Sequence, residues 1–232
     1  MTRFTTLIFA TSSMLAACAG VADAPSPTDV SGQPGKADEG GPAEPGAPMP
    51  TIPVEVDFVG YQRFEPETIA IVTSYFASIG YAVHFEVDEV LEPVDVMPYG
   101  NGNRTLAGYY RDHFGHRGQP GWHYMLMADT LENGNRGWGM IGGDMFEISA
   151  DPVDAFPEHR AEAQANIILH ELGHNLGLVH EGFEPEITAG THDETTCATS
   201  DTAPAPEVPV TVYSPNCVEH IRLDARPYLP AP

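Results

Sequence analysis

Apolar and polar residues alternate along residues 52–59 and again along residues 81–87, and this two-residue period is typical of strands with one buried face. Between these segments, large apolar residues recur at helical spacing over residues 66–79. Pro66 fits the first turn of such a helix, and Gly80 fits its end. The first part of the chain therefore predicts a strand, a helix and a second strand.

The pattern continues with strands and helices in the second half of the chain. Residues 105–114 predict a short helix, the mostly apolar run 122–128 predicts a strand, and residues 138–148 predict one or two more. The longest helical periodicity covers residues 157–178, and the chain beyond residue 179 is rich in proline and irregular. This order predicts an α+β fold, in which helices pack on a twisted mixed sheet.

The composition favours one acidic domain over residues 51–232. This segment carries 28 acidic and 8 basic side chains, and the whole chain has a formal net charge of -23. Hydrophobic residues make up 42% of the chain, which is enough to build a core. The chain has no cluster of Lys and Arg, and this excludes nucleic acid as a partner, because phosphate backbones are bound through such clusters.

The N-terminus has the features of an export signal. Arg3 precedes an apolar stretch, and residues 1–17 predict a signal peptide. The segment Leu15-Ala16-Ala17-Cys18 resembles the lipobox of bacterial lipoproteins, which implies a lipid on Cys18 and an extracytoplasmic, membrane-anchored protein. The alternative is a plain secretory signal, with Cys18 incidental and the protein secreted.

Residues 18–50 predict a disordered tether between this anchor and the domain. Of the 32 residues from 19 to 50, 21 are Ala, Gly, Pro or Ser. Such a segment has almost no large apolar side chain, so it cannot bury enough surface to offset the entropy of ordering. Its proline and glycine content favours a flexible, partly extended spacer.

The candidate chemistry lies in the segment from His170 to His180. On a helix, His170 and His174 project from one side about one turn apart, so both imidazoles can reach one zinc ion. Glu171 lies about 100° further round the helix, close enough to touch a water molecule at that ion. Gly177 allows the helix to end, and the chain can then bend so that His180 becomes a third ligand. Three histidines leave a position open for water, which favours a catalytic zinc site over a structural one.

The same helix has a second, apolar face. Six residues fall together on the arc opposite the histidines and predict the side that packs on the core: Ala161, Ala165, Ile168, Leu169, Leu172 and Leu176.

The pattern His-Glu-x-x-His-x-x-Gly-x-x-His resembles the signature of the metzincin clan of zinc endopeptidases. Residues 137–149 are similar to the segment that precedes the active-site helix in bacterial reprolysin-like or pappalysin-like members. The resemblance implies that His170, His174 and His180 bind one catalytic Zn²⁺ and that Glu171 is the general base and proton shuttle. It also implies an extended peptide or protein substrate paired with an edge strand, and a small irregular C-terminal subdomain.

The chain departs from the clan in one respect. Metzincins carry a methionine in a tight turn beneath the zinc, whereas this chain has no methionine after Met145. The equivalent turn is expected near Thr199, Tyr213 or Ile221. Tyr213 is also a candidate for the tyrosine that some metzincins move toward the zinc, although the sequence favours an ordinary packed or surface residue.

Two cysteines remain besides Cys18. In an exported chain, Cys197 and Cys217 predict a disulfide that closes a loop of about 20 residues, and the alternative is two free thiols. The group His192, Asp193 and Asp201 is a weak candidate for Ca²⁺.

The other histidines lack ligand spacing and are expected on the surface or as satisfied core residues; they are His84, His113, His116, His123, His159, His192 and His220. Two other classes of function stay open. One is a catalytically inactive, zinc-stabilised binding or adhesion lipoprotein, and the other is an acidic surface lipoprotein with an accidental motif. Nothing in the sequence specifies an oligomeric state.

Overall fold

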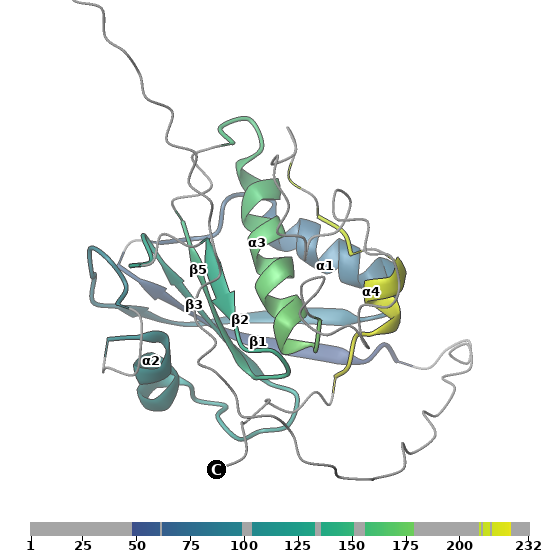
Figure 1. Cartoon of the computed structure of the whole chain (residues 1–232), viewed down its shortest axis with the longest axis horizontal. Coiled ribbons are helices and arrows are strands. Elements are labelled where there is room, and N and C mark those ends of the chain that lie inside the picture. The colour runs from purple at the N-terminus through teal and green to yellow at the C-terminus, as the bar shows by residue number, and fades with distance from the viewer. Residues whose placement is uncertain are drawn as a thin grey trace, which may run out of the picture.

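The computed structural model describes residues 48–60, 62–98, 104–132, 136–150, 156–178, 209, 211–213 and 215–223. The elements are β1 (Thr51–Val59), α1 (Thr68–Ser78), β2 (Ala82–Leu91), α2 (Leu106–His113), β3 (His123–Ala128), β4 (Gly137–Gly139), β5 (Met145–Ser149), α3 (Arg160–Asn175) and α4 (Pro215–Glu219), as Figure 1 shows. The predicted signal peptide and most of the predicted tether lie outside these residues, as do Cys18, His180, Cys197 and the calcium candidates.

The strands form one five-stranded mixed sheet in the order β2-β1-β3-β5-β4. Strands β1, β2, β3 and β5 are parallel, and β4 is antiparallel to β5. The chain moves from β1 to β2 on one side and then, through α2, to β3 on the other. The mixed sheet predicted from the sequence is confirmed.

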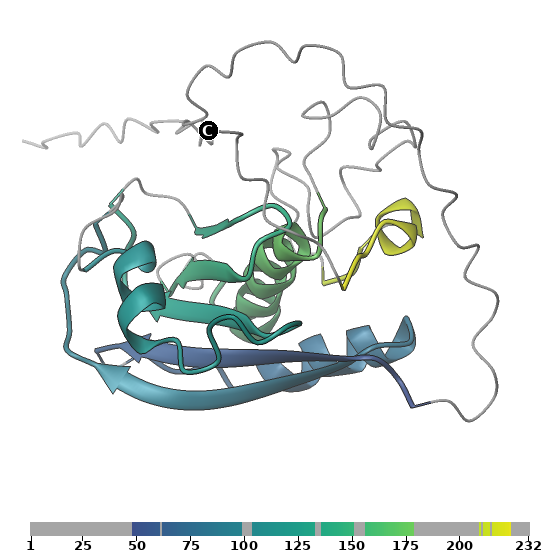
Figure 2. The same ribbon diagram turned by 90° about the horizontal axis from the view of Figure 1, so that it is seen from below.

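Side chains along β1 point alternately to the two faces of the sheet, and each face carries its own apolar cluster. Val54, Val56 and Phe58 belong to the cluster that contains the buried faces of α1 and α3. The residues between them, Glu55 and Asp57, lie on the other sheet face, where α2 packs on apolar residues of β3. In both views α2 and the short α4 lie at opposite ends of the molecule (Figures 1 and 2).

Helix α3 is buried on nearly all sides. Five of the six predicted core residues are buried, and Ala161 is half-buried. The polar residues of its other face are buried as well, because Glu171, His174 and Asn175 are 5%, 6% and 1% exposed. The helix begins at Arg160, three residues later than predicted.

A glycine ends α3, as predicted. Gly177 has a φ of 90°, in the left-handed region. Its N–H donates to the carbonyl of His174, and the N–H of Leu178 donates to the carbonyl of Gly173, both at 2.9 Å. This pair of bonds is a Schellman motif, and it turns the chain sharply just before His180.

Two details of the sequence interpretation are wrong. Pro66 does not lie in the first turn of α1, because the helix starts at Thr68 after Glu67, which has a φ of 75°. The irregular C-terminal region contains a short helix, α4, whose few residues show no periodicity that could predict it. Within the described residues, no helix is both long and apolar enough to cross a membrane.

The two edges of the sheet differ in chemistry. Along β2, the side chains of Glu86, Asp88 and Glu89 are exposed. The other edge strand, β4, has the sequence Gly-Trp-Gly and carries no charge.

Candidate active site

The two histidines of the motif face each other, as their spacing predicts. The Nε2 atoms of His170 and His174 are 3.2 Å apart, and their rings are nearly perpendicular, at 89°. Together with a carboxylate oxygen of Glu171, these nitrogens form a group whose atoms all lie within 4.8 Å of one another. One turn of α3 thus gathers three possible metal ligands.

A backbone contact fixes the tautomer of His174. Its Nδ1 lies 2.8 Å from the carbonyl oxygen of Leu178, which can only accept a hydrogen bond. Nδ1 therefore carries the hydrogen, and in the neutral ring Nε2 keeps the lone pair that faces His170. The Schellman turn places Leu178 at this position, so the end of α3 also orients this candidate ligand.

The donor set fits a zinc ion. In a tetrahedral site with Zn–N bonds of 2.0–2.1 Å, two ligand nitrogens are separated by roughly 3.3–3.4 Å. The Nε2 atoms of His170 and His174 are separated by 3.2 Å. The predicted third ligand, His180, lies outside the described residues, two positions beyond Leu178.

Strand β4 lies directly against Glu171. A methyl group built on Gly137 would come within 2.5 Å of the carboxylate Oε1 of Glu171, and one built on Gly139 within 2.5 Å of its backbone oxygen. The glutamate fits only because β4 has no side chain at these positions. The sequence pattern predicts one or two strands over residues 138–148 but indicates no role for these glycines.

The turn between β4 and β5 is tied to the end of α3. The side-chain amide of Asn175 donates to the carbonyls of Met140 and Met145, both at 2.9 Å. The N–H of Gly142 donates to the carbonyl of His174 at 2.8 Å. Sequence reasoning missed Asn175, whose only signal is a polar residue on the buried side of a helix.

The structure places Tyr213 in the core. Its hydroxyl donates to the carbonyl of Leu169 at 2.6 Å, and its ring packs edge-on against Tyr75 and Phe76 of α1. Tyr213 is therefore a packed residue, as the sequence favoured. Ile221, another position suggested for the methionine-like turn, belongs to the same apolar cluster.

The structure describes only one of the two cysteines that were predicted to form a disulfide. Cys217 is buried in α4, 7% exposed. Its expected partner, Cys197, lies outside the described residues, so the disulfide stays a prediction.

One of the remaining histidines, His123, lies in the core. His123, at the start of β3, is 6% exposed, and within the described residues its Nδ1 has no hydrogen-bond partner. Burial lowers the pKa of His123 to about 4, so the ring is neutral at pH 7. His116 is satisfied, because its Nδ1 pairs with Glu55 and its ring stacks on Trp122.

A second group of possible ligands is satisfied by protein contacts. Asp57, Glu89 and His113 offer ligand atoms within 4.8 Å of one another on the face covered by α2. Asp57 accepts from the Tyr124 hydroxyl at 2.7 Å and from the Glu89 N–H at 3.0 Å, and Glu89 pairs with His113 at 2.8 Å. Burial raises the pKa of Asp57 to about 6. These polar groups are accounted for without a ligand.

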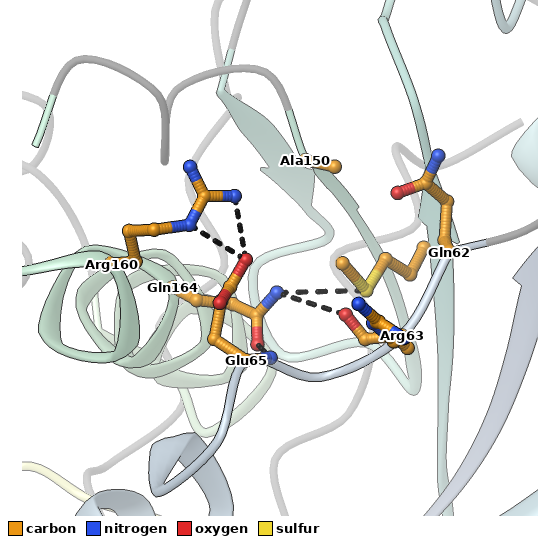
Figure 3. A pocket seen from close by; sticks show the side chains of 7 residues that line it. Gln62, Arg63, Glu65, Ala150, Arg160 and Gln164 are labelled. Carbon is orange, nitrogen blue, oxygen red and sulfur yellow. Dashed lines mark hydrogen bonds and ion pairs between the residues drawn. The ribbon is translucent and has the colours of Figure 1, made fainter. Parts of the chain in front are cut away.

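A cavity of about 410 Å³ opens near the start of α3 (Figure 3). Its lining residues are Gln62, Arg63, Glu65, Met127, Ala150, Arg160 and Gln164. Arg160 donates to Glu65 from Nε and Nη2, at 2.9 and 2.6 Å, and Gln164 accepts from the backbone N–H of Glu65 at 2.8 Å. These contacts fasten the connection between β1 and α1 to the first turns of α3.

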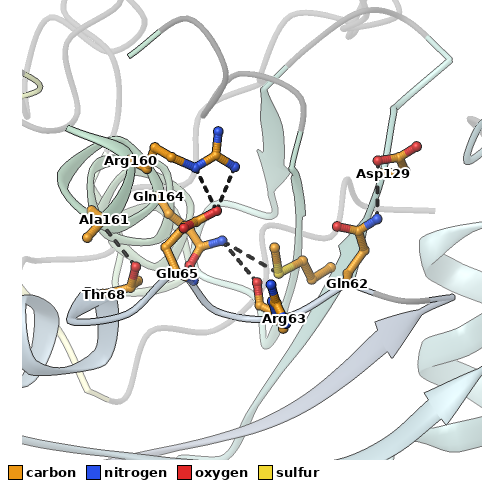
Figure 4. Close-up of polar contacts among 9 residues, drawn as sticks. Gln62, Arg63, Glu65, Thr68, Asp129, Arg160, Ala161 and Gln164 are labelled. Carbon is orange, nitrogen blue, oxygen red and sulfur yellow. Dashed lines mark hydrogen bonds and ion pairs between the residues drawn. The ribbon is translucent and has the colours of Figure 1, made fainter. Parts of the chain in front are cut away.

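The same polar cluster extends to both sides of the cavity (Figure 4). Thr68 donates to the carbonyl of Ala161 at 3.3 Å, and Gln62 donates to Asp129 at 3.1 Å. Gln164 precedes Glu171 by seven residues, roughly 10 Å along the helix. The cluster therefore anchors the opposite end of α3 from the histidines.

No family model and no curated protein matches this sequence. Among solved structures, the chain is similar to an archaemetzincin from Methanopyrus kandleri (17% identity, TM-score 0.45, 72% of this chain and 92% of that one). It is also similar to an archaemetzincin from Archaeoglobus fulgidus complexed with malonate (16%, 0.47, 73% and 99%). A third similar structure is metalloproteinase-II from Bacteroides fragilis (16%, 0.48, 78% and 55%).

Proposed function

We propose that this chain is a zinc-dependent endopeptidase of the metzincin type. The observation that carries the proposal is the pair of imidazoles in α3. The Nε2 atoms of His170 and His174 are spaced as ligands of one ion. The hydrogen bond from His174 Nδ1 to the carbonyl of Leu178 leaves Nε2, the nitrogen that would bind the ion, unprotonated. With His180 as third ligand, the site would keep one position open.

Zinc at such a site acidifies water and polarises a carbonyl group. Glu171 follows His170 directly, and a carboxylate oxygen lies within 4.8 Å of ring nitrogens of His170 and His174, so it could reach a water molecule bound at the same ion, as a general base must. In the proposed reaction Glu171 takes a proton from the attacking water and passes it to the leaving amine nitrogen. A bond forms between the water oxygen and the carbonyl carbon, and the peptide C–N bond breaks.

The substrate would be an extended peptide or protein segment. Strand β4 ends the sheet order, so within the described residues one of its edges has no strand beside it. An extended chain can add to such an edge through backbone hydrogen bonds. Because β4 also touches Glu171, a peptide bound there would run past the carboxylate.

Cleavage of a mixed peptide library by the purified full-length chain tests this proposal. The library is digested with added zinc, with a chelator, and with the variant Glu171→Gln. We expect cleavage to stop under both changes while the variant still binds zinc, because Glu171 is not among the proposed ligands. A folded chain that binds no zinc, or a variant with full activity, would refute the assignment.

We also propose that the chain is attached to a membrane through a lipid on Cys18, because the lipobox-like segment ends at this cysteine. Partition of the expressed protein into a detergent phase, compared with the variant Cys18→Ser, tests this. A wild-type chain that stays in the aqueous phase would indicate secretion instead.

A further inference from the structure

Two glycines on one face of β4 make room for Glu171. Gly137 and Gly139 are two residues apart in an extended strand, so both would point a side chain toward the same face. That face meets α3, whereas Trp138 between them packs with the apolar layer on the other side of the sheet.

The need for glycine here comes from contact and not from backbone conformation. Neither Gly137 nor Gly139 has a positive φ, so any residue could adopt the same backbone. A methyl group on Gly137 would approach Glu171 Oε1 to 2.5 Å and Cγ to 2.7 Å, and it would also approach the carbonyl oxygen of Glu147 to 2.8 Å. Real Cβ atoms essentially never come this close, so the glutamate side chain would have to move.

The second glycine lies mainly against the backbone of the same residue. A methyl group on Gly139 would lie 2.5 Å from the backbone oxygen of Glu171, 3.1 Å from its carboxylate Oε2 and 3.2 Å from its carbonyl carbon. It would therefore push the helix itself, which also carries His170 and His174. A side chain on Gly137 would therefore meet the Glu171 side chain first, whereas one on Gly139 would meet the helix backbone first and the carboxylate less closely.

We infer that Gly137 is a positioning residue for Glu171: its missing side chain leaves the space that the carboxylate occupies. The catalytic consequence of this inference rests on the proposed function. The contact between Gly137 and Glu171 does not depend on that function. Since Glu171 is 5% exposed, its side chain has little room to move elsewhere. The three atoms nearest to a methyl group on Gly137 belong to Glu171 and Glu147, so the carboxylate would be displaced before either histidine.

A cycle of stability measurements tests the contact itself. Urea unfolding midpoints are compared for the wild type, Gly137→Ala, Glu171→Ala and the double variant. We expect Gly137→Ala to lower the midpoint clearly in the wild type and much less when Glu171 has been shortened. An equal fall in the midpoint with and without the Glu171 side chain would overturn the inference. The added methyl group would then clash only with the carbonyl of Glu147.

Gly143→Ala is the matched control for this cycle. Gly143 also lacks a positive φ, and the three atoms nearest to a methyl group on it all belong to the side chain of Met140, the closest at 2.6 Å. Its effect should be the same whether or not Glu171 is present. If Gly137→Ala does not fold alone, recovery of folding in the double variant with Glu171→Ala supports the inference, and failure of both overturns it.

Kinetics then test the catalytic consequence. We expect Gly137→Ala to lower kcat roughly 100-fold, because a displacement of about 1 Å in a catalytic group has this effect. KM and bound zinc should stay unchanged, whereas Gly139→Ala should lose zinc as well. A Gly137→Ala enzyme with wild-type kcat overturns the inference. A wild type without peptidase activity refutes the proposed function, while the stability cycle still decides the contact.

Discussion

A buried carboxyl group, Glu147, should make the stability of the protein depend on pH. Glu147 lies on β5 between Leu126 of β3 and Trp138 of β4, is 4% exposed, and within the described residues has no hydrogen-bond partner for Oε2. Burial raises its pKa from 4.5 to about 7. The folded protein therefore keeps a proton that the unfolded chain loses above pH 4.5, so stability falls as the pH rises from there to about 7.

The size of this effect follows from the shift. A change of one pKa unit corresponds to about 1.4 kcal/mol, so the shift of Glu147 corresponds to about 3 kcal/mol. Glu147→Gln removes the charge while keeping the shape. At pH 8 we expect the variant to unfold at a urea concentration roughly 1–2 M higher than the wild type. The cost of burying the amide group makes this increase smaller. Near pH 4.5 the two should differ little.

Urea unfolding from pH 4.5 to 8 measures this difference. Glu92→Gln, which removes an exposed carboxylate, is the control and should follow the wild type. Asp57 contributes to the same trend at lower pH, because burial raises its pKa to about 6. If Glu147→Gln and the wild type lose stability in parallel between pH 4.5 and pH 7, Glu147 is not the buried acid that the structure indicates.

Two substitutions and one measurement on the unaltered chain test the surroundings of the site and the C-terminal region. Gly177→Ala should lower the free energy of unfolding by roughly 1 kcal/mol, because alanine disfavours a φ of 90°. The same change should weaken zinc binding, and an unchanged zinc affinity would contradict the role of this turn. Tyr213→Phe should lower stability by roughly 1 kcal/mol, through loss of its bond to Leu169, with kcat unchanged. A large fall in kcat would place Tyr213 in the site instead. Mass spectrometry with and without reduction should show one disulfide between Cys197 and Cys217, and labelling of both thiols without reduction would exclude it.

The elements of the sheet could be predicted because their patterns are local. The alternation along residues 52–59 and the apolar run at 122–128 both correspond to strands of the structure. Helix starts were less predictable: the α3 pattern begins at Pro157 in sequence, but the helix begins at Arg160. Glu67 begins α1 from a left-handed conformation, which no residue preference favours.

The candidate site was predictable only where it lies within one helix. The spacing of His170 and His174 fixes their common side, and the structure brings their Nε2 atoms together. The contacts of Glu171 with Gly137 and the bonds of Asn175 to the β4–β5 turn join segments about 30 residues apart. Such partners depend on how the sheet is ordered, and hydrophobic periodicity carries no information about that order.

The unequal edges of the sheet have a consequence for how copies of the protein can meet. Along β2, exposed acidic residues repel an approaching strand of the same charge, which is a common protection against aggregation. Strand β4 has no such protection, because its Gly-Trp-Gly sequence carries no charge. Two molecules that join edge to edge would therefore meet at β4. If a peptide binds along β4 as proposed, self-association at this edge would compete with it for the same row of backbone groups, and a high protein concentration would lower the activity.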